Sequence, residues 1–304
     1  ANPEQMAIWH DEAEAFANQE HGDLGGALAY FEPGTARFDS LLNDITSKSS
    51  FLEGGSRIQD KSALYHLHGE KIFDSEFARF TLGANGRIYT PKSEGALFSD
   101  TGGVTIINRE FGIYGGFEKR FKDDEWILKA SMRLDKNENF DFLPSPALSL
   151  IWQPKKEHSL RATFTSAIRN PTLLNQYMYY NVGRAKLVGN ISGYDSLVTI
   201  ESLRDYYYTQ NPDTLSYFNL DPIAPEEVKS VEIGYRGVLF KNLYVDMNYY
   251  FNSYTNFIGF TTGADITILQ SGFVVNDVYR IATNSRETIT TQGATIGLNY
   301  YMGD

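Results

Sequence analysis

The pattern of hydrophobic and polar positions along this chain is an alternation with a period of two residues, clearest at 226–258. Two long runs flank a short turn at 240–242. In the second run apolar or aromatic residues alternate with mostly polar ones; the first set is Leu243, Val245, Met247, Tyr249 and Phe251, and the second is Tyr244, Asp246, Asn248, Tyr250 and Asn252. A period of two over roughly ten residues is longer than most globular strands need. It suits a strand tilted across a bilayer, with one face toward lipid and the other toward a polar lumen.

The same alternation predicts about nine strands. They cover residues 62–70, 77–89, 110–121, 125–136, 145–153, 158–167, 227–239, 242–254 and 288–301. Short connections near 71–76, 122–124, 154–157 and 240–241 interleave with long ones near 90–109, 137–144, 168–226 and 255–287. Tight turns at one end and long loops at the other are typical of a membrane barrel with periplasmic turns and extracellular loops. The predicted fold is therefore all-β, with residues 62–304 forming part of a large antiparallel transmembrane β-barrel.

Side-chain chemistry agrees with this fold. Aromatic residues beside the short turns, on the predicted lipid face, would form a periplasmic girdle: Phe121, Trp126, Trp152 and Tyr300. The strand at 125–136 places Trp126, Leu128, Ala130, Met132 and Leu134 toward lipid and Ile127, Lys129, Ser131, Arg133 and Asp135 toward the lumen. An antiparallel sheet of a soluble protein, with one face toward water, would give the same division of residues. The two faces alone therefore do not distinguish a membrane barrel from a soluble protein.

Residues 1–61 differ from the rest and are predicted to be an extracellular loop region with short helices. Helical spacing indicates helices at 3–18 and 37–47, with a Gly-rich stretch at 21–26 and a turn at 54–57. The chain begins without an initiator Met or an apolar leader and ends within a strand. We therefore expect a fragment of a longer protein, in which a plug domain and the terminal strands lie outside this sequence.

Composition further narrows the classes of protein to which this chain could belong. Hydrophobic residues make up 42% of the 304 residues, and Tyr and Phe each occur 20 times, as expected where aromatic rings line two membrane interfaces. The mean hydropathy of -0.35 is low because lumen residues dilute every strand of such a barrel. A formal charge of -11 disfavours nucleic acid as a partner. The absence of Cys excludes a disulfide framework and a thiolate metal site.

Candidate chemistry is sparse. His66, His68 and Glu70 share one strand face and could hold a metal, but polar side chains lining a lumen explain them better. No nucleophile–base order, phosphate loop or paired-acid signature stands out, so we predict neither an enzyme nor a cofactor.

The long connection at 168–226 is the strongest candidate for recognition, because it holds eight of the chain's 20 tyrosines. Rigid amphipathic rings make good contact surfaces. Packing of the loop on itself is an equally good explanation. The predicted ligand-facing residues are Arg169, Tyr177, Tyr179, Tyr180, Tyr206, Tyr207 and Tyr208.

Several segments resemble a known family. Residues 165–172 read TSAIRNPT, residues 225–237 read PEEVKSVEIGYRG, and residues 248–258 read NYYFNSYTNFI. In this order they resemble the signature of TonB-dependent outer-membrane receptors. The segments LYHLHGEKIF, LGANGRIYTPKSEGALFSD and RLDKN further resemble the versions found in Bacteroidetes-type bacteria. The similarity covers roughly residues 50–301.

The resemblance implies an energised importer in the bacterial outer membrane. In this family a barrel of about 22 strands encloses an N-terminal plug. The plug engages the TonB complex, and extracellular loops bind a scarce nutrient. The expected partners are therefore TonB through the plug, an unidentified imported ligand, outer-membrane lipid and a surface lipoprotein. The alternatives are a passive porin or surface adhesin on a similar barrel, and a soluble all-β binding protein.

Overall fold

In the computed structural model the described residues are 8, 33–49, 55–183, 185–269 and 272–302. The chain divides into two compact units, Ala1–Ile58 and Gln59–Asp304. In the first unit, helix α2 (Ala36–Ser47) covers the segment 37–47, where the apolar spacing predicts a helix. Its N-cap, Thr35, accepts a hydrogen bond of 3.2 Å from the Phe38 amide. Apart from residue 8, the predicted helix at 3–18 lies outside the described residues, as do the Gly-rich stretch at 21–26 and the start of the turn at 54–57.

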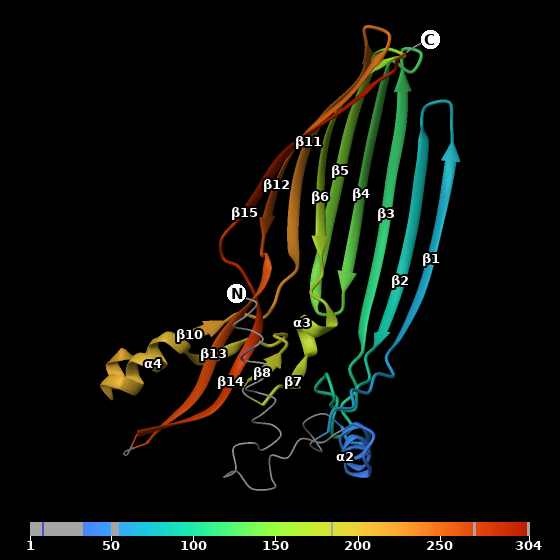
Figure 1. The fold of residues 1–304 in the computed structure, drawn as a ribbon. Coiled ribbons are helices and arrows are strands. Elements are labelled where there is room, and N and C mark those ends of the chain that lie inside the picture. The colour runs from blue at the N-terminus through green and yellow to red at the C-terminus, as the bar shows by residue number, and fades with distance from the viewer. Residues whose placement is uncertain (1–7, 9–32, 50–54, 184, 270–271, 303–304) are drawn as a thin grey trace. The chain divides into compact units, whose positions relative to one another are not determined.

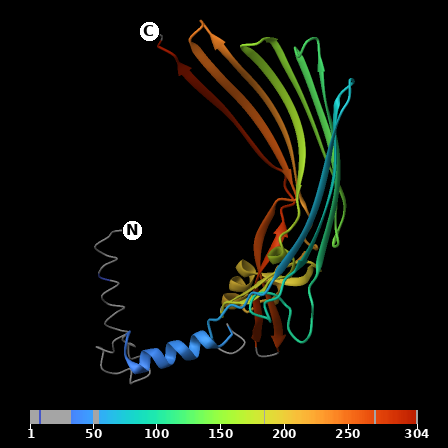
Figure 2. The same cartoon turned by 90° about the vertical axis from the view of Figure 1, so that its right-hand side faces the viewer.

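The second unit is built on a nine-stranded antiparallel sheet (Figure 1). The strands, in spatial order, are β1 (Ala63–Asp74), β2 (Arg79–Thr90), β3 (Asn108–Phe121), β4 (Trp126–Asn137), β5 (Phe140–Lys155), β6 (His158–Arg169), β11 (Glu226–Leu239), β12 (Leu243–Thr255) and β15 (Ile289–Tyr300). Each strand predicted from the alternation is present, and several are longer than predicted. The sheet curves into a wall with a concave face, and the short turns that join β1 to β2, β3 to β4, β5 to β6 and β11 to β12 lie at one end (Figure 2).

The strand pairing places residues predicted for the same face on the same side of the sheet. On the lumen side Arg236 pairs with Asp246, and on the other side Met247 pairs with Tyr235 and Ile296. Large apolar side chains of the predicted lipid face are exposed, including Leu67 at 80%, Ile296 at 69% and Met132 at 46%. An apolar face this extensive suits hydrocarbon rather than water.

Val245 is an exception on the lipid face, because it is only 5% exposed. It pairs with Gly237, and the ring of Tyr235 leans over that glycine, with its hydroxyl 2.5 Å from where a Cβ would stand. The shielding therefore comes from a neighbour on the same face. Met247, two residues along the strand, is 39% exposed.

Aromatic residues gather at the turn end of this face, as the girdle prediction requires. Trp126 and Trp152 pair across β4 and β5 and stack with ring centroids 5.5 Å apart. The Trp152 indole donates a hydrogen bond of 3.0 Å to the Glu125 carboxylate. Tyr300 pairs with Leu243 beside the last hairpin turn. Rings with one apolar and one polar end suit a membrane–water interface.

The prediction of a long connection at 137–144 is wrong. Strands β4 and β5 are joined directly at Glu138 and Asn139, so a short turn also occurs at the loop end of the sheet. Pro144 and Pro146 belong to β5 and pair with β4 alone, since the pairing with β6 begins at Ala147. Proline is tolerated in a strand where no partner needs its N–H.

The connections at 168–226 and 255–287 are not loops without regular structure. They contain α3 (Leu173–Tyr177), β7 (Tyr179–Asn181), β8 (Lys186–Val188), β9 (Tyr194–Thr199), α4 (Ile200–Thr209), the 3-10 turn η2 (Pro212–Thr214), β10 (Tyr217–Leu220), β13 (Ile258–Leu269) and β14 (Gly272–Asn284). Six of these strands form a second sheet in the order β10-β9-β13-β14-β8-β7, at the loop end (Figure 1). Val188, Leu197 and Ile281 form its buried core.

Strands β1 and β15 each pair on one side only within the described residues, so the nine-stranded sheet is an open wall. Open edges cannot persist in hydrocarbon, because each unpaired backbone group would lose its hydrogen bond to water. Further strands must therefore complete the barrel. None of the helices among the described residues is long and apolar enough to cross a membrane.

Candidate functional site

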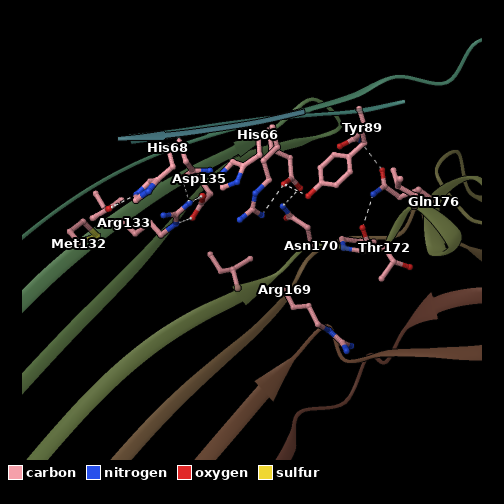
Figure 3. A pocket seen from close by; sticks show the side chains of 18 of the residues that line it. His66, His68, Tyr89, Met132, Arg133, Asp135, Arg169, Asn170, Thr172 and Gln176 are labelled. Atoms are coloured by element: carbon pink, nitrogen blue, oxygen red, sulfur yellow. Dashed lines mark hydrogen bonds and ion pairs between the residues drawn. The ribbon is translucent and has the colours of Figure 1, made fainter. Parts of the chain in front are cut away.

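A polar hollow of about 980 Å³ opens on the lumen face at the loop end of the wall (Figure 3). Strands β1 to β4 supply one side of it, and the segment between β6 and α3 supplies the other. Its lining residues are His66, His68, Asn85, Arg87, Tyr89, Asn108, Glu110, Tyr114, Ser131, Met132, Arg133, Asp135, Ile168, Arg169, Asn170, Pro171, Thr172, Leu173 and Gln176. This volume lies at the upper end of the range for small-molecule sites.

Arg133 on β4 forms the centre of the first polar network. Its guanidinium donates to both carboxylate oxygens of Asp135, at 2.6 and 2.5 Å, and to the Asn85 side-chain oxygen at 2.6 Å. Asn85 lies two strands away, so the side chain must cross β3. Gly112 permits the crossing, since a Cβ there would lie 2.5 Å from Asp135 Oδ1 and 2.8 Å from Asn85 Oδ1. A bidentate charged pair holds the guanidinium in one orientation.

A second chain of polar side chains runs along β1 and β3. The Tyr114 hydroxyl donates to Glu70 Oε2 at 2.7 Å and lies 2.8 Å from His68 Nε2. The His66 and His68 rings stack with centroids 6.4 Å apart. Glu70 is thus bound to a tyrosine, and no three His, Asp or Glu side chains of the described residues gather as a metal site.

Glu110 is the centre of a third hydrogen-bond network, which lies nearest the loops. It accepts hydrogen bonds from Tyr89 at 3.2 Å, Asn137 at 3.0 Å and Asn170 at 3.1 Å, and Arg87 lies 3.7 Å away. These bonds join three strands to the segment after β6. Asn170 Oδ1 is buried and has no hydrogen-bond partner in the described part of the chain. An unsatisfied buried acceptor is a natural point for a ligand donor.

Helix α3 begins at the Arg-x-Pro-Thr segment of the sequence. Thr172 is its N-cap, and a capping box forms as the Thr172 hydroxyl accepts from the Asn175 amide while Asn175 Oδ1 accepts from the Thr172 amide. Inside the helix, Gln176 is buried and donates to the Pro171 carbonyl at 2.6 Å. The sharp turn between β6 and α3 therefore has a fixed conformation that directs Asn170 to the hollow.

Arg169 lies at the rim, where it is tied to Glu226. Its Nη2 donates to Glu226 Oε2 at 2.7 Å, and the same oxygen accepts from the Ile258 amide at 3.0 Å. The Glu226 side chain is 8% exposed, whereas that of Arg169 is 58% exposed. Glu226 thus connects the ends of β6, β11 and β13.

The structure separates the tyrosines predicted to contact ligand. Tyr177 accepts a hydrogen bond from Asn139 beside the hollow. Tyr179 lies near Lys186, whose Nζ is 5.8 Å from its ring, and Tyr180 pairs with Leu187. On α4, Tyr207 and Tyr208 are exposed and meet edge to face at 5.4 Å. Tyr206 is 3% exposed and packs against Phe273 at 5.1 Å, so its ring supports the second sheet instead of facing solvent.

The loop at 91–107 rests against α3 and β7 and is organised by Asp100. Its carboxylate accepts bonds from Ser93 N at 2.6 Å, Ser93 Oγ at 2.7 Å, Gly95 N at 2.8 Å and Glu94 N at 3.0 Å. Burial disfavours the charge, but these bonds together hold the pKa of Asp100 below its usual range. The Tyr179 amide donates to the Leu97 carbonyl at 2.9 Å, so this loop shares a border with the site.

In the second sheet, Lys186 on β8 and Asp277 on β14 form an ion pair of 2.6 Å. The pair raises the pKa of Lys186 and lowers that of Asp277. Burial, together with a hydrogen bond of 3.0 Å to Asp277, raises the pKa of Tyr279 to about 12. These contacts fix β8 parallel to β14.

Most lining residues were missed from the sequence. Asn85 and Asp135 lie in segments that resemble the family but were not singled out as site residues, Glu110 lies in none of these segments, and the three come together only through the strand register. One signal in the sequence could have found them. They are polar residues at the alternate positions that face the lumen, within a few residues of the loop end of each strand.

The family model described as TonB dependent receptor-like, beta-barrel, matches residues 10–303. The chain belongs to this family. TonB-dependent receptors are receptors and transporters rather than enzymes, and this chain is a segment of an outer-membrane β-barrel. The soluble all-β alternative is therefore wrong.

Solved structures show the same fold. The siderophore receptor PirA from Pseudomonas aeruginosa is 18% identical with a TM-score of 0.54, over 79% of this chain and 37% of that one. The ferric enterobactin receptor PfeA from Pseudomonas aeruginosa is 16% identical with a TM-score of 0.55, over 80% and 34%. The FrpB iron transporter from Neisseria meningitidis is 15% identical with a TM-score of 0.50, over 80% and 34%. The chain thus spans less than two fifths of these structures. No curated protein matches the sequence.

Proposed function

We propose that the receptor containing this chain takes up a scarce nutrient across the outer membrane, with energy supplied through TonB. This chain contributes the middle of the barrel wall, and a plug encoded elsewhere in the receptor would engage the TonB complex. The polar hollow at the loop end of the lumen face is the observation that carries the proposal. A passive barrel has no need of a preorganised, ligand-sized site at the extracellular mouth.

Ferric siderophores are the ligand class to test first, since the related structures include a siderophore receptor and a ferric enterobactin receptor. The Asn170 acceptor and the exposed guanidinium of Arg169 offer contacts to a polar, oxygen-rich ligand. Exposed Tyr207 and Tyr208 on α4 are proposed to extend the ligand-facing surface. The extracellular location of residues 1–61 stays a prediction. A surface lipoprotein that covers this surface stays a prediction, as does the Bacteroidetes-type origin.

The test measures accumulation of radiolabelled iron by cells that produce the complete receptor and are supplied with a panel of ferric siderophores. We expect accumulation that stops when a protonophore collapses the proton gradient. The variant Asn170→Ala removes one hydrogen bond at the site and is expected to weaken ligand binding about fivefold. The control Asn276→Ala changes an exposed amide on β14, outside the hollow.

Accumulation that continues after the gradient collapses would replace the energised importer with the passive barrel. Equal binding by Asn170→Ala and the control would remove the hollow from the ligand path. A complete lack of iron accumulation with energised uptake of another nutrient would change the ligand class alone.

A further inference from the structure

The outward face of the wall carries an apolar groove across the middle of strands β1 to β4. The groove has a volume of about 690 Å³. On the outward side its walls are the exposed side chains Leu82, Ile113, Met132 and Leu134. It is distinct from the polar hollow, because these residues point to the opposite face of the sheet from Arg133 and Asp135.

The groove exists because small residues stand between larger ones. Gly69 pairs with Ala84, and the next outward pair toward the turn is Lys71 with Leu82. A Cβ on Gly69 would meet nothing within 4 Å, so the floor of the groove is open space there. At Gly115, opposite Leu82, a Cβ would lie 3.0 Å from Leu82 Cδ2. Leu82 therefore already covers Gly115, and the open part of the floor lies over Gly69, with room for a flexible apolar chain.

Two lysines lie on the outward face at the turn end of the groove. Lys71 and Lys119 form no ion pair with any described residue. Cations of the lumen face do: Arg161 pairs with Glu232 at 2.7 Å, and Lys129, a near neighbour of Lys119, pairs with Glu118 at 2.9 Å. Among the described residues, these two outward ammonium groups are therefore available to an anion from outside the protein.

Nearby aromatic residues show where along the strands these ammonium groups lie. Phe80 pairs with both Phe73 and Phe117, which places three rings in a row across β1 to β3. Lys71 Nζ is 5.9 Å from the Phe73 ring centroid, so the ammonium group extends toward this row. Lys119 Nζ lies 3.2 Å from the ring centroid of Phe77 in the adjoining turn. Both charges therefore lie on the side of the groove that faces the turn end of the strands.

We propose that this groove is a binding site for one anionic phospholipid of the periplasmic leaflet. The phosphate lies between the ammonium groups of Lys71 and Lys119, and one acyl chain fills the groove over Gly69. The leaflet follows from the hairpin turns, since short turns of such barrels face the periplasm. Charge complementarity selects an anionic headgroup over a zwitterionic one. This site depends on the outer-membrane location of the chain and not on the imported ligand.

The experiment uses the complete receptor, purified in detergent and analysed by native mass spectrometry with equal amounts of phosphatidylglycerol and phosphatidylethanolamine. We expect one tightly retained phosphatidylglycerol. Lys71→Gln removes one charge and should lower the preference for phosphatidylglycerol about fivefold. Gly69→Leu fills the groove and should weaken retention of the lipid about tenfold. Gly259→Leu is the matched control, because a Cβ on this glycine of the extracellular strand β13 also meets nothing within 4 Å.

Retention by Gly69→Leu equal to that of Gly259→Leu would overturn the site. Equal retention of the two lipids by the wild type would overturn the anionic headgroup. Assembly of each variant is checked by its heat-dependent migration in gels. If Gly69→Leu does not assemble, Lys71→Gln and Lys119→Gln decide the proposal, since an unchanged lipid preference in both would refute it.

Discussion

Asp100 offers a test of how the border of the site is held. The substitution Asp100→Asn keeps the shape of the side chain but removes the charge that accepts four hydrogen bonds from Ser93, Glu94 and Gly95. A bond to a charged acceptor contributes about 1 kcal/mol more than a neutral one, and the new amide NH₂ must face a donor. Because the carboxylate is half-buried, we expect a loss of about 2–3 kcal/mol in the local stability of the loop.

Hydrogen exchange of the complete receptor in detergent measures this loss directly. Amides at 93–98 should exchange roughly 30- to 150-fold faster in Asp100→Asn, since each 1.4 kcal/mol is a factor of ten. The Tyr179 amide, which donates to the Leu97 carbonyl, should lose protection with them. The matched control is Asp141→Asn, because the Asp141 side chain is fully exposed and lies 3.9 Å from Lys136. Unchanged exchange at 93–98 would refute the role assigned to the Asp100 carboxylate.

Two further predictions concern the second sheet. Tyr206→Ala should lower the local stability of α4 by about 3 kcal/mol, because removal of the buried ring leaves a cavity. Tyr208→Ala should change this stability by less than about 0.5 kcal/mol, because the ring is exposed. Equal effects of the two variants on hydrogen exchange in α4 would contradict this assignment. Because its folded pKa is raised to about 12, Tyr279 stabilises the sheet below the ordinary tyrosine pKa of 10.0, and this contribution is lost as the pH rises toward 12. The phenolate absorbance difference between the wild type and Tyr279→Phe should therefore titrate near pH 12, and a midpoint near 10 would exclude burial of the phenol and its hydrogen bond to Asp277 as the causes of the raised pKa.

The sequence by itself determined the nine-stranded wall and its two faces. Side chains alternate across a strand with a period of two, so the order of apolar and polar residues along the chain shows which of them face lipid or the core. The runs at 227–239 and 242–254 carry this pattern over their full length, and the structure pairs them along the whole ladder. The aromatic girdle was predictable for the same reason, since Trp126 and Trp152 lie beside short turns. The helix at 37–47 followed from apolar spacing.

Only the tertiary structure decided the second sheet and the polar hollow. Strand β8 pairs in parallel with β14, so residues such as Leu187 and Arg280 meet through a contact that no local pattern records. Three-residue strands are too short to show a period. The hollow depends on register, because Asn85, Gly112 and Asp135 become neighbours only when three strands are aligned. Tyrosine count in a loop could not distinguish a buried Tyr206 from an exposed Tyr208, since burial depends on what the rest of the chain places above each ring.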